Sequence, residues 1–484
     1  MKINQFFFVL FCFILLPMLS AQQSYVQVYG TVQTDVNRGN KIVALPNNQF
    51  VIGGEWNNKA YLVKVAANGN QLTFKLLDGN INGNSVVKDI ILDTDGSLIA
   101  VGECSRCVTT DTLTKVFAVR TDANLTPLNT RIYGGSNPTN NSLFAPAIVK
   151  KGSNLMMIAG TGGIGFNFED LVLQSLNTNL DTIWRKTINS CAACGFEYPL
   201  GLAATANGVT TIVGHAFTDS LTMYHFNTNG AVLWKNRYFT YGGLDNGTIA
   251  ANGNGKIYIG GGAKGIPGGG DPTKFVAAIT TISEANGATL AGTIINVDTL
   301  TDESVRSLAV TTDGSILVGH HRAAPNQFGT YAASRVYRLN ASDSQVAGFT
   351  ELPNPDIFTS VDIKSVVPMN ANGTQFAATG YRGLYSRTFF FSLNRVVSTK
   401  NTTLQPDFKV FPNPTSGNFN ITIPEYNEPL SLTLINLVGQ VVWTKTLDKN
   451  GPLSNQTFSV AEKGVYLLQL QSSSSIAVQK LIVK

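Results

Sequence analysis

The stretch DIILDTDGSLIAVG, from Asp89 to Gly102, decides the fold of this chain. Two apolar runs flank an Asp-Gly turn, and a glycine closes the unit. Alternating apolar residues around an Asn-Gly or Asp-Gly turn indicate a β-hairpin, because Gly and Asn tolerate the positive φ that such turns require. The same unit recurs along the chain, and its seven copies begin at Lys41, Asp89, Ala147, Gly201, Thr248, Ser307 and Ser365. The sequence therefore predicts a repeat protein built from β-hairpins.

A second hairpin follows each copy, as in KAYLVKVAANGNQLTFKLLDG from Lys59. The closing glycines of successive copies are 46 to 61 residues apart. Two hairpins in roughly 50 residues make a four-stranded sheet, and such sheets repeated radially make a β-propeller. The expected fold class is all-β, with a propeller of about seven blades in residues 22–398. Six or eight blades are the counting alternatives, and an array of β-sandwiches is the competing architecture.

The two ends of this region are complementary. The last copy continues through RTFFFSLNRVV from Arg387, but no fourth strand follows it. The stretch SYVQVYG, from Ser24, is similar to the outer strand NTRIYGG that ends at Gly135. We expect the amino-terminal strand to complete the seventh blade, so that the ring closes by hydrogen bonding without leaving an open edge.

The composition agrees with an all-β protein. Of 484 residues, 43% are hydrophobic and only 13% are Asp, Glu, Lys or Arg, and 46 are glycine. This chain is too apolar to be disordered and has too few charges for long amphipathic helices. The formal net charge is only +5, and no polybasic run is present. We therefore expect no nucleic-acid partner.

The amino terminus has the pattern of a secretory signal peptide. Lys2 precedes an apolar run from Phe6 to Leu16, which ends at Pro17 before the small residues Ser20 and Ala21. The run is shorter than the ~20 residues that span a bilayer. Cleavage is expected after Ala21, which makes residues 1–21 a signal peptide and predicts a secreted or outer-surface protein.

The body resembles bacterial propellers of the delta-60 and quinoprotein-like kinds. The similarity is carried by TNLDTIW, which ends at Trp184, and TNGAVLW, which ends at Trp234. It implies the fold and hardly bears on function.

A second domain follows a polar linker at 399–405. Residues 406–484 contain alternating strands separated by Pro-Asn-Pro and Ser-Gly turns, which predict a small β-sandwich. This tail resembles the type A carboxy-terminal sorting domain of the Bacteroidetes type IX secretion system. The matching motifs are Phe411-Pro412-Asn413-Pro414 with Gly417, Leu437-Val438-Gly439-Gln440, Gly464-Val465-Tyr466, and Gln479-Lys480 with the last four residues.

The resemblance implies how the protein reaches its destination and what it meets there. It implies contact with the type IX machinery, removal of the tail after translocation, and release or attachment to surface lipopolysaccharide.

Four cysteines remain after signal removal, in two CxxC pairs. They are Cys104 with Cys107 and Cys191 with Cys194. In an exported protein two local disulfides are the expected outcome. A four-thiolate zinc site and a redox function are the alternatives.

Polar residues just after the closing glycines are expected to form a ring at one mouth of the propeller. They are Glu55, Glu103, Thr161, His215, His320, His321, Tyr381 and Arg382. From this ring we take Glu55, Glu103, His215, His320, Tyr381 and Arg382 as candidate ligand-binding residues, because propellers bind ligands at such mouths. Ordinary solvated loop polarity is the alternative.

No motif names a reaction. We find no nucleophile elbow, zinc-protease motif or phosphate loop, so the sequence predicts no catalytic residues, no metal and no cofactor. The expected function is non-catalytic binding or adhesion of an extracellular polymer, glycan or protein. The alternatives are a hydrolase or lyase acting on extracellular polysaccharide and a structural matrix protein.

Overall fold

The computed structural model describes most of the chain. Its described residues are 23–29, 36–79, 81–107, 113–134, 142–162, 170–189, 197–215, 221–238, 247–263, 275–295, 303–322, 334–342, 344–352, 361–382, 387–394, 408–423, 430–436, 441–447, 453–471 and 476–484. The chain divides into two compact units, Met1–Arg395 and Val396–Lys484. In the described residues no helix is long and apolar enough to cross a membrane.

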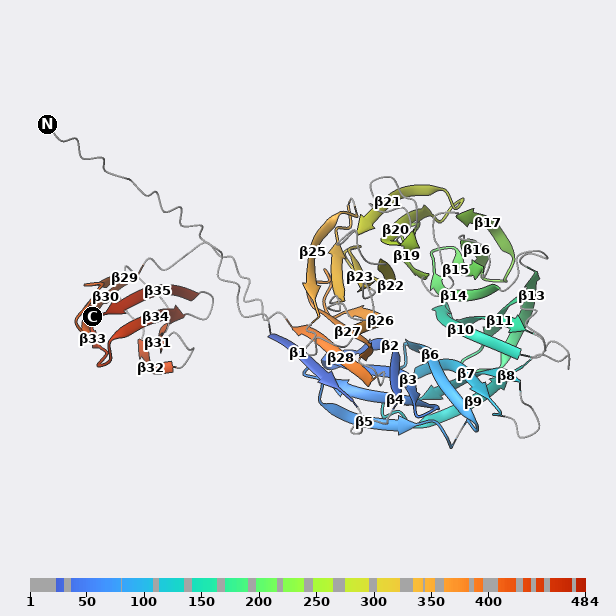
Figure 1. Cartoon of the computed structure of the whole chain (residues 1–484), viewed down its shortest axis with the longest axis horizontal. Coiled ribbons are helices and arrows are strands. Elements are labelled where there is room, and N and C mark those ends of the chain that lie inside the picture. The colour runs from blue at the N-terminus through green and yellow to red at the C-terminus, as the bar shows by residue number, and fades with distance from the viewer. Residues whose placement is uncertain are drawn as a thin grey trace, which may run out of the picture. The chain divides into compact units, whose positions relative to one another are not determined.

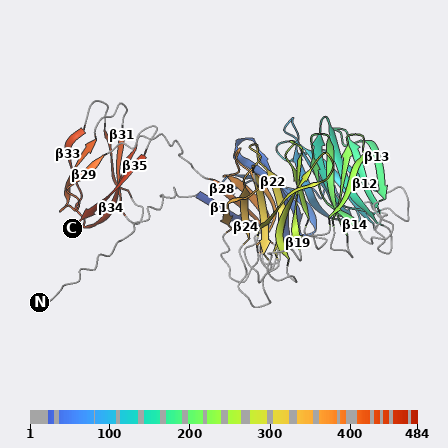
Figure 2. The same cartoon turned by 90° about the horizontal axis from the view of Figure 1, so that it is seen from above.

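Seven four-stranded antiparallel sheets form the first unit, arranged around a common centre (Figure 1). Figure 2 shows the same blades from the side. Blade 1 contains β2 (Asn37–Leu45), the 3-10 helix η1 (Pro46–Asn48), β3 (Gln49–Trp56), β4 (Lys59–Ala66) and β5 (Gln71–Leu76). Blade 2 contains β6 (Asn84–Leu92), β7 (Leu98–Ser105), β8 (Thr114–Thr121) and β9 (Pro127–Tyr133). Blade 3 contains β10 (Ser142–Lys151), β11 (Asn154–Gly162), β12 (Asp170–Leu176) and β13 (Thr182–Asn189).

The next three blades repeat this order. Blade 4 contains β14 (Glu197–Ala204), β15 (Gly208–His215), β16 (Leu221–Asn227) and β17 (Val232–Tyr238). Blade 5 contains β18 (Thr248–Ala251), β19 (Lys256–Ala263), β20 (Val276–Ser283) and β21 (Thr289–Ile295). Blade 6 contains β22 (Glu303–Val310), β23 (Ile316–Arg322), β24 (Arg335–Leu339) and β25 (Val346–Glu351). The seven-bladed propeller predicted from the repeats is confirmed.

The seventh blade combines both ends of the unit. It contains β26 (Val361–Pro368), β27 (Phe376–Arg382) and β28 (Arg387–Asn394), with β1 (Gln23–Val28) as its outermost strand. β1 pairs antiparallel with β28, from Gln23 opposite Asn394 to Val28 opposite Phe389. This pairing covers the edge of β28 and closes the ring.

Tyrosines at the ends of outer strands connect neighbouring blades. Each hydroxyl donates a hydrogen bond to a backbone carbonyl in the outer hairpin turn of the next blade. The three pairs are Tyr29 to Gly69 at 2.8 Å, Tyr133 to Leu180 at 2.6 Å and Tyr238 to Gly287 at 2.6 Å. The amino-terminal strand therefore makes the same contact as the outer strands of blades 2 and 4.

The closing glycines allow the blades to pack closely. A Cβ atom on Gly53 would lie 2.5 Å from Ile90 Cδ1 of blade 2, and one on Gly319 would lie 2.8 Å from Ile363 Cγ2 of blade 7. Such distances are shorter than carbon atoms tolerate, so a larger residue here would force side chains of the next inner strand to move. Hydrophobic clusters fill the rest of each interface, such as the one that contains Val51 of blade 1 and Phe117 of blade 2.

The second unit is a β-sandwich, as the sequence predicts. One sheet contains β29 (Lys409–Phe411), β30 (Asn418–Ile423) and β33 (Leu453–Ser459). The other contains β32 (Val441–Leu447), β31 (Leu430–Asn436), β34 (Gly464–Gln471) and β35 (Ile476–Val483). Its core includes the fully buried Phe419, Leu432 and Leu468, so this unit has its own hydrophobic core.

Candidate functional site

The inner strands of all seven blades line one cavity of about 410 Å³. Because each blade contributes its first strand, this cavity lies in the central channel of the propeller. Six of these strands carry a β-bulge at the cavity, which places an extra, unpaired residue in the strand. The bulges occur at Asn40, Lys88, Ala145 with Pro146, Leu200, Arg306 and Lys364.

The lining has two chemically different halves. Cationic side chains come from the adjacent blades 6, 7, 1 and 2, and they are Arg306, Lys364, Lys41 and Lys88. Blades 3 to 5 contribute apolar or small residues, including Pro146, Leu200 and Gly247. The channel is therefore cationic on one side and apolar on the other.

Asp89 connects three blades beneath the cationic side. Its carboxylate lies 2.9 Å from the Lys41 ammonium and accepts hydrogen bonds from the backbone amides of Ile90 and Ile148, both at 3.0 Å. In blade 6, Ser307 has the same position after the bulge and accepts a hydrogen bond from the Val366 amide at 3.0 Å. Asp89 and Ser307 thus hold neighbouring inner strands together. Both carboxylate oxygens of Asp89 already have an ion-pair or hydrogen-bond partner.

Glu103, a member of the predicted ring, lies beside the channel. One carboxylate oxygen is 3.3 Å from the Lys88 ammonium, and the other accepts a 2.5 Å hydrogen bond from the Ala145 amide at the bulge of blade 3. Glu55 and Glu103 also line a smaller cavity of about 160 Å³ between blades 1 and 2. The structure thus brings these two predicted residues together, with Glu103 holding the channel wall.

Tyr381 belongs to a second polar cluster behind the cationic wall. Asp362 lies 3.0 Å from the Lys364 ammonium and 3.7 Å from His321 Nδ1, and the Lys364 ammonium stands 5.2 Å from the Tyr381 ring centroid. Burial, reinforced by Asp362, raises the pKa of Tyr381 to about 12. Its hydroxyl is therefore protonated at neutral pH.

The other two groups of this cluster also have shifted pKa values. Burial lowers the pKa of His321, which keeps the imidazole neutral at neutral pH. Burial alone would raise the pKa of Asp362, but Lys364, His321 and Arg306 together hold it below its ordinary value. The cluster combines a neutral imidazole, a protonated phenol and a carboxylate, and none of the three lines the channel cavity.

The side chain of His320 does not lie with the other residues of the predicted ring. Its side chain is fully buried, with Nε2 3.4 Å from Glu303 Oε2 and its ring edge-on to Tyr337. A buried imidazole cannot contact a ligand in the channel, so the expected role of His320 at the mouth is not supported by its placement.

The strand register explains which ring members share a position. Glu55, Glu103, Thr161, His321 and Tyr381 all pair with the residue two places before a bulge. His320 pairs with Val305, one residue before the bulge, and adjacent strand residues face opposite sides of a sheet. His215 and Arg382 pair with Glu197 and Val361, three places before the bulge, so neither has the register position of Glu103.

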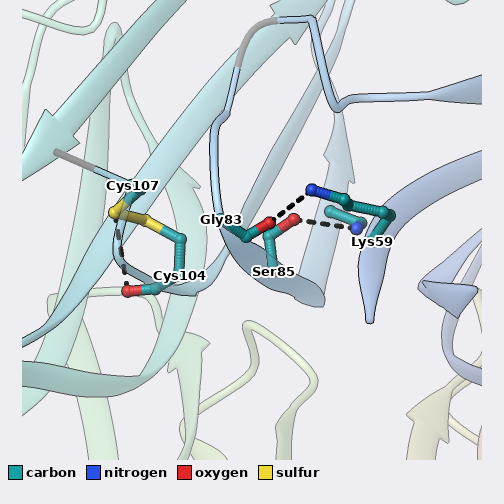
Figure 3. The surroundings of a disulfide bond; sticks show 6 residues. Lys59, Gly83, Ser85, Cys104 and Cys107 are labelled. Atoms are coloured by element: carbon teal, nitrogen blue, oxygen red, sulfur yellow. Dashed lines mark hydrogen bonds between the residues drawn. A yellow bond between two sulfur atoms is a disulfide. The ribbon is translucent and has the colours of Figure 1, made fainter. Parts of the chain in front are cut away.

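A disulfide joins Cys104 and Cys107 where β7 ends (Figure 3). Both residues are buried, and their Cα atoms are 5.7 Å apart. Nearby, Lys59 donates a 2.8 Å hydrogen bond to the Gly83 carbonyl. This bond joins the start of β4 in blade 1 to the residue that precedes β6 in blade 2. The other predicted pair, Cys191 with Cys194, lies outside the described residues.

In the tail, hydrogen bonds join the first and the last of the matching motifs. Asn413 Oδ1 accepts a 2.9 Å hydrogen bond from the Ile482 amide, and Asn413 Nδ2 donates a 2.5 Å hydrogen bond to the Lys480 carbonyl. The peptide bonds preceding Pro412 and Pro414 are both cis. The hydrogen bonds of Asn413 hold the Pro-Asn-Pro turn against β35.

The glycines of the tail motifs lie at a turn and a strand end. Gly417 has a φ of 123°, a value that favours glycine. Gly464 begins β34 opposite Val483, and the Tyr466 hydroxyl donates a 2.9 Å hydrogen bond to the Glu462 carbonyl. Gly439 lies outside the described residues.

The sequence pattern did not predict the cationic lining of the channel. Lys88, Arg306 and Lys364 each stand immediately before a repeat copy, which begins at Asp89, Ser307 and Ser365 respectively. A break in the alternation of apolar residues could have indicated these positions. In VVKDII, for example, the bulge inserts one extra residue into the strand.

The tail matches a known protein family. Residues 409–484 fit the family described as the secretion system C-terminal sorting domain. The predicted type IX sorting domain is confirmed, and with it an exported propeller protein that is secreted or located on the outer cell surface. No curated protein matches the chain in sequence.

Several solved structures are similar in fold. Hydrazine synthase of Kuenenia stuttgartiensis has a TM-score of 0.48 at 12% identity, covering 73% of this chain and 95% of that one. The Cps50 (Swd1) β-propeller domain of Myceliophteria thermophila has a TM-score of 0.42 at 8% identity, covering 76% and 100%. A Lactobacillus plantarum protein has a TM-score of 0.41 at 9% identity, covering 65% and 84%. The propeller assignment rests on this chain's own strand order.

Proposed function

We propose that the propeller is a non-catalytic binding module that takes an extracellular polymer, glycan or protein at its central channel. The observation that carries this proposal is the channel cavity, to which blades 6, 7, 1 and 2 contribute charged hydrogen-bond donors and blades 3 to 5 contribute apolar or small residues. A rigid, concave and amphipathic site of this kind suits ligand recognition. The sorting domain delivers the module outside the cell, where it acts attached to surface lipopolysaccharide or released.

The polar groups of the lining favour binding over hydrolysis. Among the described residues that line the cavity, Asp89 is the one carboxylate, and its oxygens are taken by Lys41 and backbone amides. Hydrolysis of a glycosidic bond usually requires two carboxyl groups about 5 to 10 Å apart across the substrate. The described lining lacks such a pair.

A polysaccharide lyase is the second candidate, and one cluster favours it. A neutral imidazole at His321 could accept a proton, and the protonated Tyr381 could donate one, next to the cations Arg306 and Lys364. Elimination from an acidic sugar needs this combination of base, acid and carboxylate neutralisation. For such chemistry the cluster would have to become accessible from the channel.

A binding panel with a product assay separates the two functions. The purified protein is applied to immobilised polysaccharides, glycans and extracellular proteins, and both retention and newly formed reducing or unsaturated ends are measured. Retention without new ends supports a binding module. New ends that disappear in His321→Asn and Tyr381→Phe variants would overturn it in favour of the lyase.

A further inference from the structure

We infer that the propeller has a second ligand site on its rim, at the seam where the amino-terminal strand meets blade 1, and that this site takes a saccharide. The inference goes beyond the proposed function, which concerns the central channel. Its basis is an open cleft of about 740 Å³, whose lining combines aromatic rings with amide side chains.

Two elements form the walls of this seam cleft. The strand β1 lines one side with Gln27 and Val28, and blade 1 lines the other with Trp56, Phe74 and its outer hairpin turn at 69–71. The seam cleft and the channel cavity share no described lining residue. The two sites can therefore be tested separately.

Polar contacts close the equivalent space at two other blade interfaces. In both, the side chain two positions before the joining tyrosine reaches the next blade. The Arg131 guanidinium of blade 2 lies 2.9 Å from the Asp181 carboxylate of blade 3. The Asn236 amide of blade 4 donates a 3.0 Å hydrogen bond to the Gly287 carbonyl of blade 5.

Gln27 holds the same position at the seam, two residues before Tyr29, but it does not reach blade 1 in this way. Its side chain is exposed, and no described residue forms a hydrogen bond with it. The Tyr29 hydroxyl still joins the seam through its hydrogen bond to the Gly69 carbonyl. The seam is thus closed by Tyr29, while the Gln27 amide remains available to a ligand.

The aromatic rings of the seam cleft are held in fixed positions. Phe74 stacks on Tyr61 with ring centroids 5.7 Å apart, and Trp56 lies edge-on to Phe74 at 5.1 Å. Tyr61 is fully buried, and its hydroxyl is 2.8 Å from Thr388 Oγ1 of blade 7. A ligand therefore meets rings that are already ordered, which lowers the entropy cost of binding.

The lining suits a sugar ring. Three exposed amides, those of Gln27, Asn70 and Gln71, line the cleft beside the two aromatic rings. Each amide group has two donors and a carbonyl acceptor, and each sugar hydroxyl both donates and accepts. The C–H groups on the face of the sugar pack against the apolar surface of an aromatic ring. We therefore assign the cleft to a saccharide.

An extended peptide is the alternative occupant. β1 is the outermost strand of its sheet, so its outer edge could pair with another strand. The three amide side chains and the two rings favour the saccharide, and peptide binding becomes an outcome of the test.

Blade 4 supplies the variant for this test. Ala231 and Val232 hold the positions of Asn70 and Gln71 in its outer turn, and the Ala231 carbonyl accepts the same turn-closing hydrogen bond as the Asn70 carbonyl. The double variant Asn70→Ala, Gln71→Val therefore gives blade 1 residues that this turn already accommodates. Asn229→Ala, which removes an exposed amide from the outer turn of blade 4, is the matched control.

All proteins are compared in a Leu200→Trp background, which enlarges a side chain of the channel lining and so removes binding in the channel. Binding of cellotriose, mannotriose and chitotriose is measured by saturation-transfer NMR. Thermal melting verifies that each protein is folded. The comparison is repeated without Leu200→Trp, so that it does not depend on the folding of that variant.

We expect one or more of the trisaccharides to bind with a dissociation constant on the order of 1 mM, because an open cleft leaves the ligand partly in water. Binding this weak does not retain the protein on an immobilised polymer. The double variant should bind roughly tenfold more weakly, because two hydrogen-bonding amides are lost. Asn229→Ala should not change the affinity.

Three results would overturn the inference. One is the absence of binding by all three trisaccharides to the folded protein. Another is equal affinity of the double variant and its background, which would place the saccharide elsewhere. The third is binding of a blocked pentapeptide of alternating threonine and valine without binding of any trisaccharide, which would replace the saccharide by a peptide strand. None of these results bears on the channel, whose binding function is tested by retention.

Discussion

The hydroxyl of Tyr29 donates a 2.8 Å hydrogen bond to the carbonyl of Gly69, joining the amino-terminal strand to the outer turn of blade 1. This contact lies where the two ends of the propeller meet. Tyr133 makes the equivalent contact with Leu180 between blades 2 and 3. The ring is thus closed by the same interaction that connects blades in its interior.

Removing the closing hydroxyl should weaken the propeller. We expect Tyr29→Phe to lower the free energy of unfolding by about 1 kcal/mol, because a buried carbonyl loses its donor. Urea denaturation measures the change. Tyr133→Phe is the matched control and should cost a similar amount; a loss in this control with none in Tyr29→Phe would argue against closure by the amino-terminal strand.

Asp89 should be the most sensitive polar residue of the channel wall. Asp89→Asn removes the ion pair with Lys41 and turns an amide donor towards backbone amides that now donate to the carboxylate. We expect a loss of about 2 to 3 kcal/mol in unfolding free energy. The exposed Asp78→Asn should change it by less than about 0.5 kcal/mol. Equal stability of the two variants would refute the role of Asp89 as a link between blades.

Two histidines should make the propeller less stable as the pH falls from 7 to 5. Burial lowers the pKa values of His225 and His321 in the folded protein, so the unfolded chain takes up protons first as the pH passes below about 6.5. The stability they contribute is present above that pH and lost below it. His225 Nε2 of blade 4 also lies 3.9 Å from Glu284 Oε1 of blade 5.

Denaturation curves at pH 7 and pH 5 test this dependence. The double variant His225→Asn, His321→Asn should show a smaller difference between the two pH values than the wild type. An unchanged difference would mean that other groups titrate in this range.

Asn413 should be required for export through its role in the tail fold. Asn413→Ala removes hydrogen bonds to Ile482 and Lys480, and we expect the sorting domain to lose roughly 1 to 2 kcal/mol. Cell fractionation should show less protein outside the cell, with Lys409→Gln in the exposed part of β29 as the control. Normal export of the Asn413→Ala variant would show that sorting does not depend on this motif.

The architecture could be predicted because local patterns determine it. Alternating apolar residues and a closing glycine recur in every blade, most blades have an Asn-Gly or Asp-Gly turn, and the similarity of the strand at Ser24 to NTRIYGG indicated how the ring closes. The tail motifs are likewise local in sequence. Their mutual contact, between Asn413 and Ile482, joins residues 69 positions apart and could not be foreseen from either motif alone.

The candidate site was harder to predict because bulges change the register. Gly319 pairs with Ser307, after the bulge of blade 6, whereas Gly102 pairs with Val87, before the bulge of blade 2. The residue directly after the closing glycine therefore has a different register position in blade 6 than in blade 2. As a result, His320 lies in the core and His321 has the ring position. The same bulges present Arg306 and Lys364 to the channel, an arrangement that alternation alone does not show.

Ligand retention by a propeller with a blocked channel is the decisive measurement. Leu200→Trp enlarges a side chain that lines the cavity, and it is compared with the wild type on the same panel of polysaccharides, glycans and proteins. We expect the wild type to be retained without releasing products and the folded Leu200→Trp variant not to be retained. Retention that the variant preserves in full, or products released by the wild type, would contradict a non-catalytic binding site in the central channel.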